Sequence, residues 1–274
     1  MPIITISREM GTGALGIARD VAKKLRYTLV DGAKISELGS KYGLTSDILE
    51  RVDEKPPVYI TAEDRHQAAY LNSIELIILD LARKGNVIIY GRGGQDLLKG
   101  MDNVLRIRFV APFEERVEML AEREWMDPDL ARHLIRKSDH QRGGFIHFYF
   151  NRDWQDPLGY DLIYNTTKLT APSIVDSIVA AAKDPCLKEA DLTSRDLIDN
   201  IIVNKRVETA LLESQEIEYL HFNIESDKGI VTLSGHVHSD GERKSALSII
   251  AKVKGVKRVD DQLQVANVSA KMKE

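Results

Sequence analysis

A glycine-rich loop near the start of the chain has the residue types and spacing of a phosphate-binding cradle. An apolar run at residues 3–6 precedes it, and apolar residues at helical spacing follow it. Such a strand, loop and helix aim backbone N–H groups and the positive end of a helix dipole at one point. A tight turn without a ligand is the alternative interpretation. The residues predicted to hold phosphate are Gly11, Thr12, Gly13, Ala14, Leu15 and Gly16.

Two charged residues at the ends of later apolar runs could take part in the same chemistry. Arg92 lies between glycines directly after residues 87–90, and its planar guanidinium suits bidentate binding of phosphate. Asp31 ends a short run at residues 27–31, at the sheet edge where ligands bind in open α/β sheets. The alternatives are a solvated arginine in a plain turn and a carboxylate that only caps the next helix.

The segment 139–150 combines Asp139, Arg142, two glycines and four aromatic residues. It follows residues 113–138, which are rich in charge and are predicted to be helical with a break at Asp127 and Pro128. Most charges of that helix are expected to be solvated and paired along the surface. The segment 139–150 is instead predicted to be a lid, with basic residues over phosphate and aromatic residues against the body.

The elements that must position these residues alternate between strands and helices. Such alternation implies a parallel sheet with right-handed crossovers, and residues 1–185 are ample to bury a core. A linker is predicted at 186–192, followed by a smaller α+β domain at 193–268 with the order αββαβ. The predicted strands are 27–31, 87–90, 104–110 and 160–165 besides the first, and then 222–225, 230–237 and 256–265.

The composition is that of a soluble globular protein, with 43% hydrophobic and 29% charged residues in a chain of 274. No apolar run approaches the length of a membrane span, and the chain starts directly with a strand, so a cytoplasmic location is expected. Residues 1–185 hold 25 basic against 27 acidic residues, and the rest hold 13 against 15. Because neither part is basic, nucleic acid is not expected as the main partner.

Neither a disulfide nor a metal centre is predicted. The single cysteine, Cys186, cannot form an intrachain disulfide. His236 and His238 share one face of a strand, but no third ligand accompanies them, so a solvated face is the preferred interpretation.

Residues 1 to about 183 resemble the cytidylate kinase-like family, relatives of the bacterial (d)CMP kinases among the P-loop nucleoside-monophosphate kinases. The order and spacing of the matching residues make the resemblance specific. These residues are 4–9 with Gly11 and Gly13, Asp31, 91–93, Asp139, Arg142, 153–154, 156–157, 160–162 and 165–166.

Residues 193–267 resemble a BON domain, a module known from bacterial osmotic-stress and envelope proteins. The residues that carry this second resemblance are 229–237, Glu242 with Arg243, and 255–259. The two resemblances together imply a P-loop kinase-like α/β domain fused to a small binding domain.

The first resemblance implies transfer of phosphate from Mg·ATP to a nucleoside monophosphate, most simply CMP or dCMP. The loop from Gly11 to Gly16 would hold the ATP phosphates, and Asp31, Arg92 and Asp161 would face the acceptor. Arg142, with Asp139 beside it, would neutralise charge on the transferred group, because this chemistry relies on positioning and electrostatic stabilisation.

The loop departs from the G-x-G-K-[GS]-T pattern of these kinases. Ala14 stands at the position of the lysine, and Gly16 stands at the position of the hydroxyl that binds Mg²⁺. We expect Arg8, which leaves the first strand at the mouth of the loop, to supply the missing cation in preference to Arg19 on the helix.

A second function, from a different class, follows from this departure. A catalytically weak regulatory protein could bind a nucleotide through the first domain and a partner, ion or lipid through the BON domain. The degenerate loop favours this alternative, whereas Arg92, Asp139, Arg142 and Asp161 favour the kinase.

Overall fold

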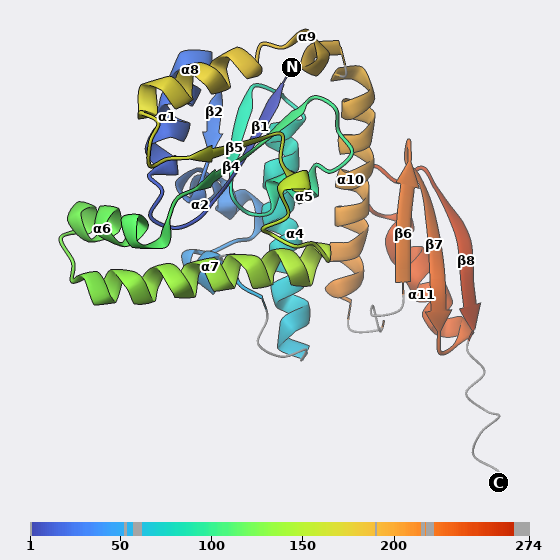
Figure 1. Cartoon of the computed structure of the whole chain (residues 1–274). Helices are drawn as coiled ribbons and strands as arrows, with labels where there is room; N and C mark the ends of the chain where they lie inside the picture. The colour runs from blue at the N-terminus through green and yellow to red at the C-terminus, as the bar shows by residue number, and fades with distance from the viewer. Residues whose placement is uncertain are drawn as a thin grey trace.

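The computed structural model describes residues 2–51, 54–56, 62–189, 191–214, 217 and 222–265. Its larger sheet is parallel, with the strand order β2-β3-β1-β4-β5, so all its strands end at the same edge (Figure 1). This confirms the predicted parallel α/β architecture. The strands are β1 (Ile3–Arg8), β2 (Thr28–Val30), β3 (Val87–Tyr90), β4 (Val104–Val110) and β5 (Leu162–Asn165).

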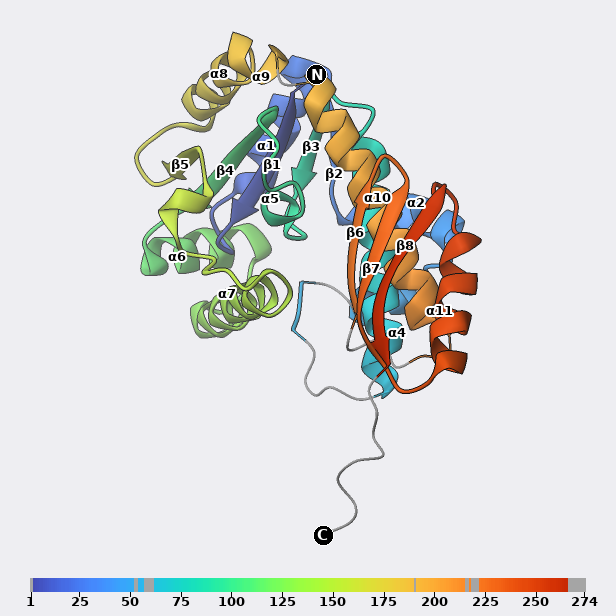
Figure 2. The same ribbon diagram turned by 90° about the vertical axis from the view of Figure 1, so that its right-hand side faces the viewer.

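Helices cover both faces of this sheet, as its continuous apolar strands require. Because successive side chains of a strand point to opposite faces, Ile3 packs into one core and Ile4 and Ile6 into the other. Helices α1 (Ala14–Leu25) and α8 (Ala171–Ala181) cover the face of Ile4. Helices α2 (Gly32–Gly39), α4 (Ala62–Ala82) and α10 (Asp191–Leu212) cover the other face (Figures 1 and 2).

Helix α7 (Pro128–Phe150) runs across the carboxyl edge of the sheet (Figure 1). The break before it is confirmed, because α6 (Phe113–Glu124) ends before Asp127, whose carboxylate caps α7. The predicted end of the helix at residue 138 is wrong, since residues 139–150 continue α7, and the role of this segment as a lid stays a prediction. A Cβ on Gly144 would lie 3.1 Å from Pro56, so the glycine allows close packing that offsets its poor helix propensity.

The remaining short elements connect these layers. They are η1 (Ser40–Tyr42), α3 (Ser46–Arg51), α5 (Gly94–Leu97), η2 (Pro157–Gly159) and α9 (Pro185–Glu189). The segment predicted as a linker thus contains part of a short helix and the start of α10, and the domain boundaries stay a prediction.

The C-terminal part forms a separate three-stranded sheet with a core of its own. Strand β6 is antiparallel to β7, and β8 is parallel to β7. With α10 this gives the predicted order αββαβ. The bounds are β6 (Phe222–Asp227), β7 (Ile230–Val237), α11 (Asp240–Ala251) and β8 (Arg258–Val265).

Helix α10 belongs to both cores and joins the two sheets (Figure 2). Ile198 and Ile202 pack into the core of the larger sheet, whereas Val207 and Leu211 pack under the smaller one. A buried ion pair crosses the contact with α4, where Lys205 Nζ lies 2.9 Å from a carboxylate oxygen of Glu75. The two sheets are therefore joined by one continuous helix.

An Ile198→Ala substitution is expected to lower the free energy of unfolding by about 2–5 kcal/mol. Ile198 is only 1% exposed, so its truncation leaves a cavity between α10 and the larger domain. Leu197, the preceding residue on the same helix, is 39% exposed and supplies the matched control. Urea denaturation should separate the two alanine variants. Equal destabilisation would contradict the role assigned to α10.

Candidate nucleotide-binding site

The loop predicted to hold phosphate, residues 11–16, lies between β1 and α1 and has the geometry of an anion cradle; we call it the phosphate loop. Gly11 and Gly13 adopt left-handed backbone conformations, with φ of 92° and 70°. Gly13 is the N-cap of α1, and no side chain caps that helix. The N–H of Gly16 turns back to the carbonyl oxygen of Gly13 at 3.1 Å. The N–H groups of Ala14 and Leu15 come before that first bond of the helix and remain available to a ligand.

The structure shows the surroundings of the two positions at which the loop departs from the kinase pattern. Ala14 is 2% exposed and packs into the core beneath the loop. Gly16 is exposed, and a Cβ there would meet no atom within 4 Å. The loop therefore offers backbone donors and the helix dipole, and positive charge must come from other elements.

Arg116 is the buried cation that contacts this loop. Its Nη1 donates to the carbonyl oxygen of Met10 at 3.0 Å and lies 2.6 Å from the Asp139 carboxylate. Asp139 in turn accepts from the backbone N–H of Met10 at 2.9 Å. Gly11 must lack a side chain, because a Cβ would lie 2.7 Å from the Arg116 carbonyl oxygen. Arg116 and Asp139 thus tie the loop to α6 and α7.

Arg116 was not among the predicted site residues, because most charges of residues 113–138 were expected to form a solvated surface. The signal was its position in the helix, directly before Val117 and four residues before Leu120, both of which are buried. An arginine in the apolar stripe of an amphipathic helix faces the body of the protein.

Glu9 joins the loop to β4. Its carboxylate lies 3.5 Å from Arg108 and 3.4 Å from Arg116, and it accepts from the N–H of Ala111 at 3.3 Å. Arg108 is itself buried, and its guanidinium lies over the Trp154 ring at 4.2 Å. The carboxylate next to the loop is therefore held by two arginines.

Arg8, which was expected to serve the phosphate loop, turns toward β3 instead. Its guanidinium lies over the Tyr90 ring at 4.5 Å, and its Nη1 donates to Glu54 at 2.8 Å. Arg142 donates from Nε to the other carboxylate oxygen of Glu54 at 3.1 Å, and the backbone N–H of Arg92 also donates to Glu54. We call Arg8, Arg92 and Arg142 the arginine group. No sequence signal singled out Glu54.

Electrostatics keep Glu54 ionised within this group. Burial alone would raise the pKa of Glu54, but Arg8, Arg142 and Arg92 together hold that pKa well below its usual range. Burial lowers the pKa of Arg142, and the nearby Arg8 lowers it further. Two largely buried guanidinium groups, with side chains 13% and 17% exposed, thus face the same carboxylate.

The turn after β3 is shaped by these contacts. Gly91 has a φ of 78°, and a Cβ there would overlap both the Arg8 guanidinium and the Glu54 carboxylate. Arg92 follows with a φ of 58°, a conformation that few residues other than glycine adopt. The Arg92 side chain is 9% exposed and extends to the start of α2, where a Cβ on Gly32 would lie 3.9 Å from Nη2.

Asp31 and Asp161, the other two predicted acceptor residues, have different surroundings. Asp31 caps α2 by accepting from the N–H of Lys34 at 3.0 Å, which is the alternative that the sequence left open. It directly precedes Gly32 and so lies beside Arg92. Asp161 precedes β5 and accepts from the N–H of Arg106 at 2.7 Å. Because parallel strands start at the edge opposite the loop, the structure does not bring Asp161 to the others.

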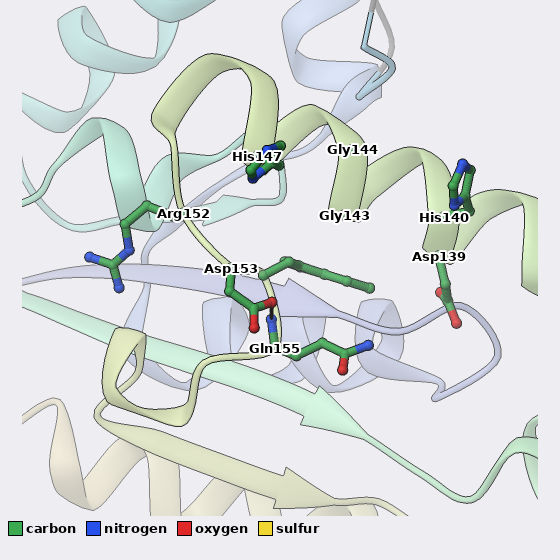
Figure 3. Close-up of a pocket in the computed structure, with 9 residues that line it drawn as sticks. Asp139, His140, Gly143, Gly144, His147, Arg152, Asp153 and Gln155 are labelled. Carbon is green, nitrogen blue, oxygen red and sulfur yellow. Dashed lines mark hydrogen bonds between the residues drawn. The ribbon is translucent and has the colours of Figure 1, made fainter.

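A pocket of about 400 Å³ lies along α7 and the segment that follows it (Figure 3). Asp139, His140 and His147 line it from the helix, and Arg152 and Asp153 line it from the segment after the helix. Asp139 also binds the phosphate loop, so the pocket borders the loop through that residue. No group of three or more metal-ligating side chains was found among the described residues.

The stability of the protein is expected to fall in acid partly through Glu54. Its pKa in the folded chain lies below the ordinary value of 4.5, so the ionised carboxylate stabilises the fold above that pH. This contribution is lost as the pH falls through the folded pKa. In urea denaturation, the free energy of unfolding of Glu54→Gln should therefore fall less steeply than that of wild type from about pH 5 to pH 3. Parallel pH profiles would contradict this assignment.

The fold and the loop define the class of protein, which is a P-loop kinase-like α/β protein. The model of the cytidylate kinase-like family matches residues 3–168. The chain belongs to the cytidylate kinase-like family, and a BON domain, matched over residues 201–267, follows at its C-terminal end.

Two relatives from archaea are similar to about two thirds of this chain. A cytidylate kinase of Methanocaldococcus jannaschii is 30% identical over 187 residues, 66% of this chain and 97% of that protein. A cytidylate kinase of Methanopyrus kandleri is 29% identical over 198 residues, 69% of this chain and 96% of that protein. Both organisms are archaea.

A solved structure supports the fold alone. It is an uncharacterized protein from Eubacterium ventriosum, with a TM-score of 0.53 and 24% identity, covering 66% of this chain and 97% of the other. As for membranes, a search of the described helices found none with both the length and the apolar character needed to cross one.

Proposed function

We propose that this protein transfers the γ-phosphoryl group of ATP to a nucleoside monophosphate, with CMP or dCMP as the acceptor. One observation carries the proposal: helix α7 joins the phosphate loop to the arginine group. Asp139 ties α7 to the phosphate loop, and Arg142, three residues later on the same helix, is a member of the arginine group and donates to Glu54. A donor phosphate chain at the loop and an acceptor phosphate at the arginine group would therefore meet under one helix.

Each group has a distinct task in this proposal. The backbone N–H groups at the start of α1 bind the ATP phosphates, and Arg116 and Asp139 hold the loop in shape. Arg8 and Arg142 bind the acceptor phosphate, while Asp31 and Arg92 contact the acceptor from α2 and β3. An acceptor oxygen attacks the γ-phosphorus, the bond to the β-phosphate oxygen breaks, and ADP leaves. Positioned cations stabilise the transferring group, which is most of what this chemistry needs.

Magnesium fits this site as an ion carried by the nucleotide. Mg²⁺ usually binds one or two carboxylates together with substrate phosphates, rather than a dedicated cage of side chains. Glu9 is the carboxylate next to the loop, and it is shared between Arg108 and Arg116. When bound, Mg²⁺ would neutralise phosphate charge that the loop, without its lysine, leaves uncompensated.

The proposed setting is the bacterial cytoplasm, where ATP and nucleoside monophosphates are present. The BON domain is proposed to bind a further ligand or protein.

A coupled assay for ADP release tests the transfer, using Mg·ATP with each nucleoside monophosphate in turn. Turnover with CMP or dCMP that is lost in Arg142→Ala would support it, because that variant measures any contaminating kinase.

A second candidate function is nucleotide sensing with little catalysis, and the residues at positions 14 and 16 favour it. Absence of turnover above the Arg142→Ala background with every acceptor would contradict the kinase. Binding of ATP without turnover would then support the sensing function and direct attention to the BON domain.

A further inference from the structure

The arginine group already holds an anion, and that anion is part of the chain itself. Glu54 accepts from Arg8 at 2.8 Å, from Arg142 at 3.1 Å and from the backbone N–H of Arg92. The cavity lined by Arg8, Glu54, Arg142 and their neighbours is about 10 Å³, room for a single water molecule at most. A phosphate group cannot enter until the Glu54 carboxylate leaves.

The donors around Glu54 are those that a phosphate would use. Guanidinium groups and backbone N–H groups bind carboxylate and phosphate oxygens with the same geometry. A carboxylate carries one negative charge, whereas a phosphate monoester carries between one and a half and two at pH 7. The phosphate of a nucleotide therefore has the electrostatic advantage in a competition for the two arginines.

The backbone at Glu54 is strained in a way that favours its release. Its φ is 42°, in the left-handed region, and Arg92, which donates to it, has a φ of 58°. Residues other than glycine rarely adopt this conformation, and such strain gathers at ligand clamps and switch regions. Ionic contacts hold Glu54 in place, so a stronger anion that takes over those contacts also releases the strain.

We propose that Glu54 occupies the position of the acceptor phosphate and is displaced by it, which makes Glu54 a specificity-determining residue for acceptors that carry a dianionic phosphate. The inference rests on the proposed function, because it places the acceptor phosphate at the arginine group. A nucleoside without a phosphate brings no charge to the two arginines and leaves Glu54 where it is.

The alternative role for Glu54 is to hold the two arginines in position for the ligand. The two roles predict opposite changes in phosphate affinity when the Glu54 carboxylate is removed. Under the displacement proposal, Glu54→Gln removes the competing charge and leaves Arg8 and Arg142 without the anion that they share, although Arg142 keeps Asp139 at 3.8 Å. Isothermal titration of the full-length protein with inorganic phosphate and with CMP should then show binding about tenfold tighter or more. Titration with cytidine should show no gain.

A matched control variant separates the effect of losing a buried carboxylate on stability from its effect on phosphate affinity. Glu75 is also a buried carboxylate paired with a cation, Lys205, but it lies at the contact of α4 with α10. Glu75→Gln should lower the melting temperature without changing the affinity for phosphate or CMP. Glu54→Gln should lower the melting temperature of the free protein and enlarge its rise on adding phosphate.

Unchanged or weaker phosphate binding by Glu54→Gln would overturn the inference. If that variant does not fold, Glu54→Asp takes its place, since the shorter side chain cannot reach both arginines and should also bind phosphate more tightly. Tighter phosphate binding without turnover of any nucleoside monophosphate would leave the inference standing and contradict the kinase. Turnover of a nucleoside monophosphate by the wild type, together with weaker phosphate binding by the variant, would support the kinase and overturn the inference. If neither the wild type nor the variant binds phosphate or CMP, both the inference and the proposed kinase function are overturned.

Discussion

The Arg142→Ala variant is expected to lose turnover by about 10²–10³ while it keeps most of its affinity for ATP. Arg142 lies on α7 in the arginine group, where the acceptor phosphate is proposed to bind, and three residues from Asp139, which holds the loop. A cation at this position stabilises the charge that develops on the phosphoryl group in the transition state. Its loss should therefore lower kcat more than it raises KM for ATP.

Two further variants test this assignment. Lys137 is an exposed cation on the same helix, so Lys137→Ala should leave turnover unchanged. Arg142→Lys keeps the charge but loses the planar fork, and it should recover only part of the activity. A rise in KM for ATP with normal kcat would place Arg142 at the donor phosphates and contradict the proposed role.

The strands and the phosphate loop were predictable because their signals are local. Continuous apolar runs marked β1 and β3, and the glycines after them marked positions where the backbone must turn with a positive φ. The αββαβ order of the second domain also follows from local signals, a hairpin turn at 227–229 and the S-x-x-E pattern of a capping box at 239–242. In the structure Ser239 accepts from the N–H of Glu242, as that capping box requires.

The contents of the site were less predictable because they depend on contacts between distant residues. Glu54 meets Arg8 across 46 positions and Arg142 across 88, and no local pattern encodes either distance. Arg8 was assigned to the wrong neighbour for the same reason. Its position at the end of β1 was correct, but its direction depends on Tyr90 and Glu54.

The continuous helix α7 shows how packing overrides a local signal. The predicted helix ended at residue 138, before two adjacent glycines, which disfavour a helix interior, and a cluster of aromatic residues. In the structure Phe145 and Ile146 are buried directly after the glycines, and Gly144 lets the helix approach Pro56. Burial of those two apolar side chains offsets the low helix propensity of the two glycines.

A Gly91→Ala substitution should be among the most damaging single changes at the site. The backbone there has a φ of 78°, and an added methyl would overlap the Arg8 guanidinium and the Glu54 carboxylate together. A left-handed conformation costs roughly 1–2 kcal/mol for a residue with a Cβ. Displacing two buried, ion-paired side chains should add roughly 1–3 kcal/mol, as overpacking does in a core.

Gly43 supplies the control that separates the two costs. Its φ is 74°, nearly the same as at Gly91, but a Cβ there would meet nothing within 4 Å. Gly43→Ala should therefore show only the backbone cost, and the difference between the two variants in urea denaturation should report the clash. Phosphate affinity adds a second readout, because only Gly91→Ala disturbs the arginine group. If the two variants lose the same stability and both bind phosphate normally, the packing of Arg8 and Glu54 against Gly91 is not what shapes this turn.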